Sequence, residues 1–205
     1  MTDTADLAET GTRDRILSAA RNLLHREGYS AVGVAEICRE AGVVKGSFYH
    51  FFPSKADLLS EVLRRNWRGA NGALETLLES PGPARDRIAR FFQIVVANAR
   101  RMHREDGVIY GCNIGVLASE LGPSLSEAEE ELRGIFNQWR RHFAALIRAG
   151  QKDGSVSESC DPDATAAALL ASIQGMSVLG RTLNDPDMIE AVANSALAQV
   201  PAGNH

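Results

Sequence analysis

The stretch "GVVKGSFYHFFPSK", residues 42–55, gathers four aromatic side chains, one histidine and two lysines. Phe48 and Phe52 are four residues apart, so on a helix they share one face. We predict that this face packs against Ile37 and an earlier helix. The opposite face then presents polar side chains to the outside: Lys45, Ser47, Tyr49 and His50.

The residues just before this stretch predict a second short helix. Val34, Ile37, Cys38 and Ala41 repeat at three- and four-residue steps, and the pattern stops at Gly42. Two short helices joined by the connector 41–44 favour a helix-turn-helix, in which glycine permits a tight turn and the second helix faces the DNA major groove. Residues 42–55 are thus expected to supply both buried core side chains and exposed side chains that contact DNA.

Helical patterns cover most of the remaining chain, and strand patterns are nearly absent. We therefore predict an all-α fold of about nine helices. Seven of them are expected after Thr12 to near Gly28, at 34–41, at 45–52, from Ser54 to about 78, at 88–103, at 116–121 and up to Gly150.

Several residues mark helix starts. Thr12 suits the N-cap of the first helix, and Ser54–Asp57 and Ser124–Glu127 have the spacing of capping boxes. Asp-Pro pairs at 161–162 and 185–186 each supply an N-cap followed by proline at the first helical position. We expect these pairs to open the last two helices.

The composition is that of a soluble globular protein: 205 residues, 44% hydrophobic and 23% charged. Residues 1–11 lack the positive start and apolar block of a secretion signal. The most apolar run, 164–173, is shorter than the ~20 residues that cross a bilayer. Three widely spaced cysteines fit neither a disulfide framework nor a zinc site. We expect a cytoplasmic protein with no metal site and no cofactor.

The charge is unevenly distributed. Net charge is −4 overall, which taken alone argues against a nucleic-acid binder. Residues 12–55, however, hold seven basic and four acidic side chains, a net +3, while the remainder holds 15 basic and 22 acidic, a net −7. A basic segment at residues 12–55 in an otherwise acidic chain indicates two parts with separate functions.

Residues 12–60 resemble the N-terminal DNA-binding domain of the TetR/AcrR family of transcriptional regulators. The matching segments are "RILSAARNLLHREGY", "VAEICREAGVVKGSFYHFFPSKADLL" and the direct passage into a long helix. The resemblance implies a helix-turn-helix domain at 12–53 and a ligand-binding and dimerisation domain at 54–200, with a disordered tail at 1–11 and a C-terminal tail at 201–205.

The resemblance also implies a function. Family members act as homodimers on palindromic DNA operators, and a small-molecule effector releases a repressor from its site. Here Gly46 would start the recognition helix, Tyr49 would reach the DNA backbone and Lys55 would lie near a phosphate. The full expected set of DNA-binding residues is Thr12, Arg13, Arg39, Lys45, Gly46, Ser47, Tyr49, His50 and Lys55.

Three positions depart from the family pattern. Val32-Gly33 and Val44 stand where family members often carry serine or threonine, so hydroxyl groups for capping or phosphate contact are missing, although Gly33 still suits an N-cap. Phe51 replaces a more usual histidine or tyrosine. These departures bear on individual contacts and leave the fold prediction unchanged.

The second domain is expected to bind the effector and to dimerise. Its aromatic residues, Phe91 among them, can line an apolar cavity with polar groups nearby, including Asn98. The candidate ligand contacts are Trp67, Phe92, Tyr110, Cys112, Asn113, Phe136, Trp139 and Gln174. Small and apolar residues at helical spacing near the end of the chain predict a two-fold helical interface: Ala168, Ser172, Gly175, Met176, Leu179 and Val192.

Cys112 raises an alternative function. It lies in "YGCNIG" just before a predicted helix, and a helix N-terminus can lower the pKa of a thiol. Two interpretations of Cys112 therefore remain: a redox or electrophile sensor in a protein of the same fold, or a small buried hydrophobic residue. Cys38 is expected in the helix-turn-helix core and Cys160 in a surface loop.

The sequence also bears on two other classes of function. No GxSxG, HExxH or phosphate-loop motif is present, so we expect no enzyme and no catalytic residues. A helical dimer that has lost DNA binding and acts through protein contacts is a third possibility, and Val44 and Gly33 favour it slightly.

Overall fold

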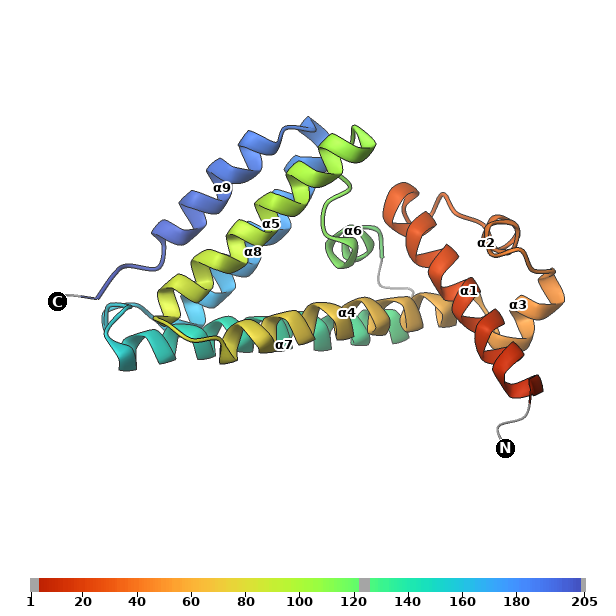
Figure 1. Ribbon diagram of the computed structural model, residues 1–205, viewed down its shortest axis with the longest axis horizontal. Coiled ribbons are helices and arrows are strands. Elements are labelled where there is room, and N and C mark those ends of the chain that lie inside the picture. Colours follow the sequence, from red (N-terminus) through yellow and green to blue (C-terminus); the bar gives the residue numbers. More distant parts are fainter. Residues whose placement is uncertain (1–3, 122–125, 204–205) are drawn as a thin grey trace. The chain divides into compact units, whose positions relative to one another are not determined.

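The computed structural model describes residues 4–121 and 126–203, and within these ranges it has nine helices and no named strand (Figure 1). The predicted all-α fold is confirmed. The helices are α1 (Thr4–Glu27), α2 (Val34–Ala41), α3 (Lys45–Phe51), α4 (Lys55–Glu79), α5 (Ala84–Asp106), α6 (Asn113–Glu120), α7 (Ser126–Asp153), α8 (Pro162–Leu183) and α9 (Pro186–Ala198).

The first of two compact units comprises residues 1–67 and 116–133. In it α1, α2 and α3 pack against one another. The apolar stripes that the sequence predicted meet in its core, where the largest fully buried side chains include Ile16, Leu17, Leu24, Ile37 and Phe48. The first part of α4, the end of α6 and the start of α7 complete this unit.

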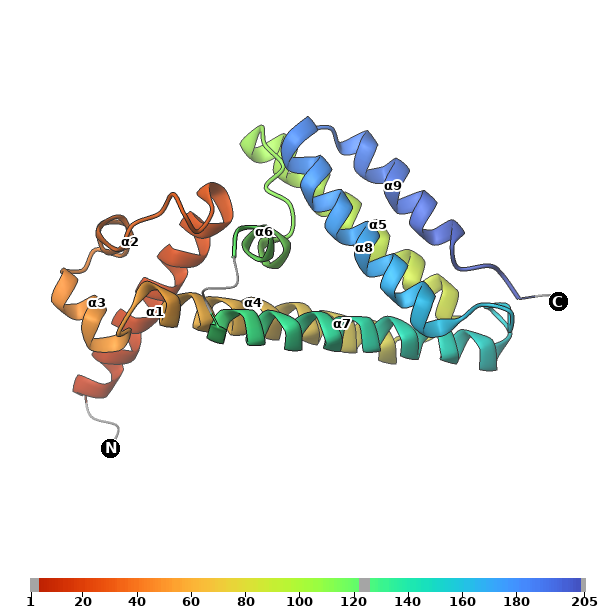
Figure 2. The same ribbon diagram turned by 180° about the vertical axis from the view of Figure 1, so that it is seen from behind.

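The second unit comprises residues 68–115 and 134–205. Helices α5, α8 and α9 lie side by side in both views (Figures 1 and 2), and α9 packs against both α5 and α8. Its core includes Ile88, Phe92, Phe143, Leu169 and Ile189, all buried.

The units are discontinuous in sequence, which differs from the expected boundary at 53/54. The chain passes from one unit to the other within α4, α6 and α7. Helical periodicity identifies which face of a long helix is apolar, but it does not say which end of the helix belongs to which core.

The predicted caps of α4, α8 and α9 are confirmed. The Ser54 hydroxyl accepts a hydrogen bond from the Asp57 amide at 3.2 Å. Asp161 accepts from the amides of residues 163 and 164, and Asp185 from those of 187 and 188. The other expected capping box, at Ser124, lies outside the described residues.

Some helix ends differ from the prediction. α1 begins at Thr4, so residues 4–11, expected in the N-terminal tail, are helical; this segment is rich in Ala, Leu and Glu, which favour helices. α7 continues past Gly150 to Asp153. At Gly150 the absent side chain lets Val156 pack where a Cβ would lie, 2.4 Å from a methyl carbon. This glycine therefore serves close packing rather than termination.

Two of the three cysteines are buried. Cys38 lies in the helix-turn-helix core, as predicted. The prediction for Cys160 was wrong, because its sulfur is buried 3.2 Å from the Thr165 hydroxyl at the start of α8. In the C-terminal segment, Ala202 forms an isolated antiparallel bridge with Val156.

Candidate DNA-binding surface and ligand cavity

The inner face of α3 is fixed by two aromatic residues. Phe48 and Phe52 are 0% and 2% exposed, and their ring centroids are 5.9 Å apart. Ile37 of α2 is fully buried in the same unit. The prediction that Phe48 and Phe52 belong to the core is confirmed, and burial of two such side chains orients α3 firmly.

The outer face of α3 carries the residues predicted to contact DNA. Lys45, Gly46, Tyr49 and His50 are exposed and Ser47 is half-buried, so one short helix presents all five together. Tyr49 is 54% exposed although its ring contacts Phe48 edge-to-face at 5.2 Å. The tyrosine is thus anchored at its base while its outer part remains accessible.

The turn between α2 and α3 has the geometry that its glycine permits. Gly42 has φ +64°, in the left-handed region, and its amide donates to the carbonyl oxygens of Arg39 and Cys38. Gly33 is the N-cap of α2, as expected, and Val44 is the N-cap of α3. Neither N-cap supplies a side-chain hydrogen bond, and Val44 is 72% exposed.

Three of the residues predicted to contact DNA have partners within the first unit. The Arg13 guanidinium donates to Glu61 at 2.8 Å and lies over the Phe52 ring. Arg39 pairs with Glu36 at 3.0 Å, one turn earlier on α2. Thr12 accepts a hydrogen bond from Arg15 at 3.3 Å.

Lys55 is held by the turn after α1. Its ammonium donates to the Tyr29 carbonyl oxygen and lies 4.0 Å from the centre of the Tyr29 ring. Burial lowers the pKa of Lys55, while the Glu120 carboxylate acts in the opposite direction. Glu120, the last residue of α6, also accepts from the Ser30 amide at 3.1 Å. This turn therefore links α1, α4 and α6 in one polar cluster.

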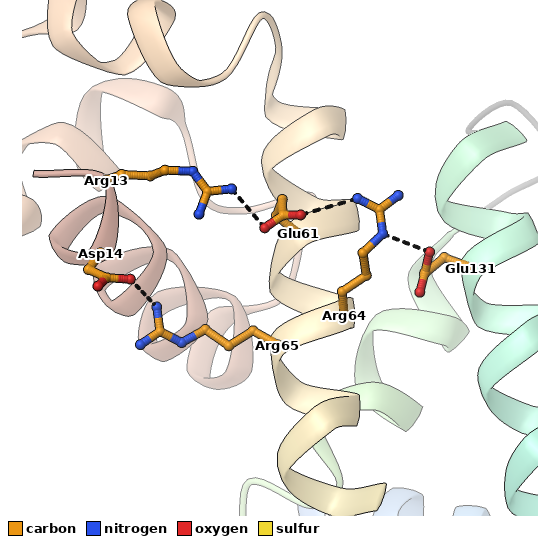
Figure 3. Close-up of polar contacts among 6 residues, drawn as sticks. All are labelled: Arg13, Asp14, Glu61, Arg64, Arg65 and Glu131. Carbon is orange, nitrogen blue, oxygen red and sulfur yellow. Dashed lines mark hydrogen bonds and ion pairs between the residues drawn. The ribbon is translucent and has the colours of Figure 1, made fainter. Parts of the chain in front are cut away.

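A chain of ion pairs ties α1 to α4 and α4 to α7 (Figure 3). Glu61 accepts from Arg13 at 2.8 Å and from Arg64 at 3.2 Å, and Arg64 also donates to Glu131 at 2.9 Å. The hydrogen bond from Arg13 is the main cause that lowers the pKa of Glu61, and the hydrogen bond to Glu131 is the main cause that raises the pKa of Arg64. The Glu61 carboxylate is therefore ionised at neutral pH.

A parallel pair lies beside this chain. Arg65 donates to Asp14 at 2.7 Å, again joining α4 to α1 (Figure 3). Helices α1 and α4 are thus connected twice by charged side chains that the sequence analysis did not identify. The signal was present in the alternating charges of these helices, but pairing between helices cannot be read from spacing along one chain.

The second unit contains a cavity of about 160 Å³. Its wall is made by α5, the loop before α6, and residues of α7, α8 and α9. The lining residues are Phe91, Val95, Asn98, Ala99, Met102, Ile109, Gly111, Cys112, Trp139, Ile173, Met176, Ser177 and Ile189. The wall is almost entirely apolar and contains no charged side chain.

One end of the cavity is polar. The Cys112 amide donates to the Ser177 hydroxyl at 2.8 Å, and Gly111 reaches its conformation with φ +77° beside Ser177. Cys112 keeps some exposed surface, but its thiol lies deep among protein atoms. Burial raises the pKa of Cys112, only partly offset by hydrogen bonds from the amides of Gly115 and Ile114. The group is therefore a thiol at neutral pH.

Two of the eight predicted ligand contacts, Cys112 and Trp139, line this cavity. Trp67 belongs to the first unit. Phe92 lines a separate hollow between α5 and α9. The remaining four, none of which lines the cavity wall, are Tyr110, Asn113, Phe136 and Gln174. Phe91, expected among the aromatic lining residues, and Asn98, expected as a nearby polar group, both line the cavity.

The predicted dimer residues divide between two faces. Met176, predicted in the dimer interface, is 2% exposed and lines the cavity, and it lies on the same side of α8 as the buried Leu169 and Ile173. Ala168, Ser172, Gly175, Leu179 and Val192 are half-buried. The outward stripe of α8 also contains residues that the sequence analysis missed: Ala167, Ala171 and Val178, the last 57% exposed.

α8 is the one described helix with the length and composition to cross a membrane, and a third of its apolar window is buried. Its buried side comprises residues such as Ala166, Leu169 and Ile173. The open side is the stripe of small and apolar residues just described.

Comparison with known proteins agrees with this architecture. Residues 16–62 match the family model "Bacterial regulatory proteins, tetR family", and residues 84–196 match "Tetracyclin repressor-like, C-terminal domain". The chain is 32% identical over 170 residues to the HTH-type transcriptional repressor DhaR of Mycobacterium sp. (strain GP1), covering 82% of each. It is 30% identical over 177 residues to the transcriptional regulator AcuR of Cereibacter sphaeroides, covering 86% of this chain and 79% of AcuR.

A solved structure gives the same result. The crystal structure of regulatory protein TetR from Rhodobacter sphaeroides is 28% identical, superposes with a TM-score of 0.82, and covers 91% of this chain and 97% of that one. Both domains, the helix-turn-helix and the helical unit with the cavity, are thus matched along the chain. The protein belongs to the TetR family of bacterial transcriptional regulators.

Proposed function

We propose that this protein is a homodimeric repressor that binds a palindromic operator through α3 and leaves it when a small molecule occupies the cavity of the second unit. The observation that carries the proposal is the outer face of α3. There Lys45, Tyr49 and His50 are exposed together because Phe48 and Phe52 anchor the opposite face. Such a face suits the major groove and its flanking phosphates.

The dimer is proposed through α8 and α9. Ala167, Ala171 and Val178 form an exposed stripe on α8, and Met188 of α9 is 37% exposed. Small residues let a second helix approach closely, and a two-fold interface pairs the same patch on each copy. Two copies would then present two α3 helices to half-sites about one turn apart.

Release by an effector requires a difference in affinity between two states. The effector must bind better to the conformation that does not fit the operator. Cys112 lines the cavity and directly precedes α6, which ends at Glu120 beside the turn after α1. A shift of this loop is therefore transmitted along a single helix. As a member of this family, the protein is expected to act in the cytoplasm.

The DNA-binding part is tested with promoter DNA from beside its own gene. Lys45→Ala and Tyr49→Ala should each abolish specific retardation, while Lys152→Ala, which removes an equal charge from an exposed position at the end of α7, should bind like the unaltered protein. Affinity should also fall steeply with salt. Retained specific binding in both α3 variants would refute the assignment of the recognition surface.

A cysteine sensor is a second candidate, favoured by one observation: Cys112 lines the cavity. Its raised pKa counts against it, since thiolates rather than thiols react with electrophiles and oxidants. Labelling with iodoacetamide at neutral pH separates the two. A Cys112 that reacts no faster than buried Cys38 and Cys160 would leave the sensor without support.

A further inference from the structure

The wall of the cavity defines the chemistry of what it can hold. None of its lining side chains is Asp, Glu, Lys, Arg or His. A charged molecule entering this cavity would lose its hydration without gaining a counterion, which is costly in an apolar environment. The cavity therefore selects against ions of either sign.

Its size limits the apolar part of the molecule. The volume of about 160 Å³ is close to that of an engineered cavity of ~150 Å³ in another protein, which is lined by Leu, Ile and Phe and binds benzene. Phe91 and Trp139 add aromatic surface, with ring centroids 6.5 Å apart in an edge-to-face arrangement. A ligand of about the size of one substituted benzene ring fills this space.

Ser177 supplies this cavity with a buried hydroxyl group. It is 5% exposed and lines the cavity, and its oxygen accepts from the Cys112 amide at 2.8 Å. Ser172, five residues earlier on α8, donates its proton to the Ala168 carbonyl oxygen. Within residues 4–121 and 126–203, no acceptor takes the proton of Ser177, which leaves it available inside the cavity.

We propose that the effector is a small uncharged molecule with an apolar body of about one ring and a single terminal hydrogen-bond acceptor, which Ser177 recognises. The role of this molecule as an effector rests on the proposed function, whereas its chemical class rests on the cavity alone. Ser177 is then the residue that determines specificity among neutral molecules of equal size.

The test uses the full chain, without DNA, and four probes followed by calorimetric titration. Benzonitrile has a terminal acceptor, and phenylacetylene has the same shape without one; benzylammonium and benzoate carry charges. Both neutral probes should bind, with benzonitrile about 2- to 10-fold tighter, the factor that one net hydrogen bond gives. Each charged probe should bind more than 10-fold more weakly than benzonitrile.

Two substitutions assign the binding to this site. Ser177→Ala should reduce the ratio of the two neutral affinities to about one, and Ser177→Cys, which keeps a partner for the Cys112 amide but is a weak donor, should do the same. Val95→Phe, placed at a half-buried wall position, should abolish binding of both neutral probes. Thermal melting checks that each variant is folded.

The outcomes are decisive in both directions. Absence of neutral-probe binding, a charged probe within 10-fold of benzonitrile, or an unchanged affinity ratio in both Ser177 variants would each overturn the proposal. Promoter retardation of the unaltered protein is measured separately. A protein that binds the neutral probes but no DNA would refute the proposed repressor and leave the ligand chemistry standing.

Discussion

Two glycines in the loop between α5 and α6 provide a matched pair for testing how the cavity end is built. Gly107 and Gly111 both have left-handed backbones, with φ +72° and +77°. A Cβ at Gly107 would meet nothing within 4 Å. A Cβ at Gly111 would lie 2.5 Å from the Ser177 hydroxyl and 2.8 Å from the Ser177 carbonyl oxygen, which α8 holds in place.

The expected costs differ accordingly. In Gly107→Ala a left-handed Cβ costs about 1–2 kcal/mol, offset by about 0.4–1 kcal/mol from the stiffer unfolded chain, so the net loss is about 1 kcal/mol. Gly111→Ala carries the same cost plus overpacking of about 1–3 kcal/mol, giving about 3 kcal/mol. For a chain of this length the melting temperature should fall by about 3 °C and about 9 °C.

The measurement is thermal unfolding followed by circular dichroism at one fixed protein concentration, because the stability of an associating protein depends on it. Gly111→Ala should also weaken benzonitrile binding, since it displaces Ser177, whereas Gly107→Ala should leave it unchanged. Equal losses of stability in the two variants would show that contact with Ser177 does not constrain the loop, and the account of the polar end would be wrong.

Two further substitutions test the charges and caps. Glu61→Gln should lower stability by about 0.5–1 kcal/mol, since the partly exposed carboxylate joins Arg13 to Arg64. Because the pKa of Glu61 is lowered in the folded state, its contribution is present above its unfolded pKa of about 4.3 and is lost as pH falls through the lower folded value. Denaturation of Glu61→Gln should thus differ least from that of the unaltered protein in strong acid, whereas a constant difference across pH would contradict this. Asp161→Ala should cost about 1 kcal/mol through loss of the α8 cap, and an unchanged denaturation midpoint would count against it.

The helix-turn-helix could be predicted because its determinants are local. Phe48 and Phe52 are one helical turn apart, Gly42 sits at the only turn between two short periodic segments, and both features follow from spacing alone. The caps at Asp161 and Asp185 were predictable for the same reason. Each depends on atoms within a few residues of one another.

The cavity could be predicted only in part because it depends on which helix faces converge. Aromatic content suggested Trp139 and Phe92 equally, yet they line different hollows. Ser177 was missed, although one signal existed: if Ala168 and Gly175 face outward on α8, residues on the opposite side, such as Ile173 and Ser177, face inward.

The ion pairs of the first unit set a condition on how DNA is held. If Arg13 binds a DNA phosphate, it must first break its ion pair with Glu61. This exchange costs little free energy, because a partly exposed ion pair contributes about 0–1 kcal/mol to stability. Glu61 keeps Arg64 meanwhile, so α4 stays linked to Glu131 while its tie to α1 loosens. By thermodynamic reciprocity, a movement of α4 that strengthens the Arg13–Glu61 pair weakens the grip on DNA. Removing the carboxylate should therefore make the protein less stable and its DNA complex tighter, a combination that a purely structural ion pair would not produce.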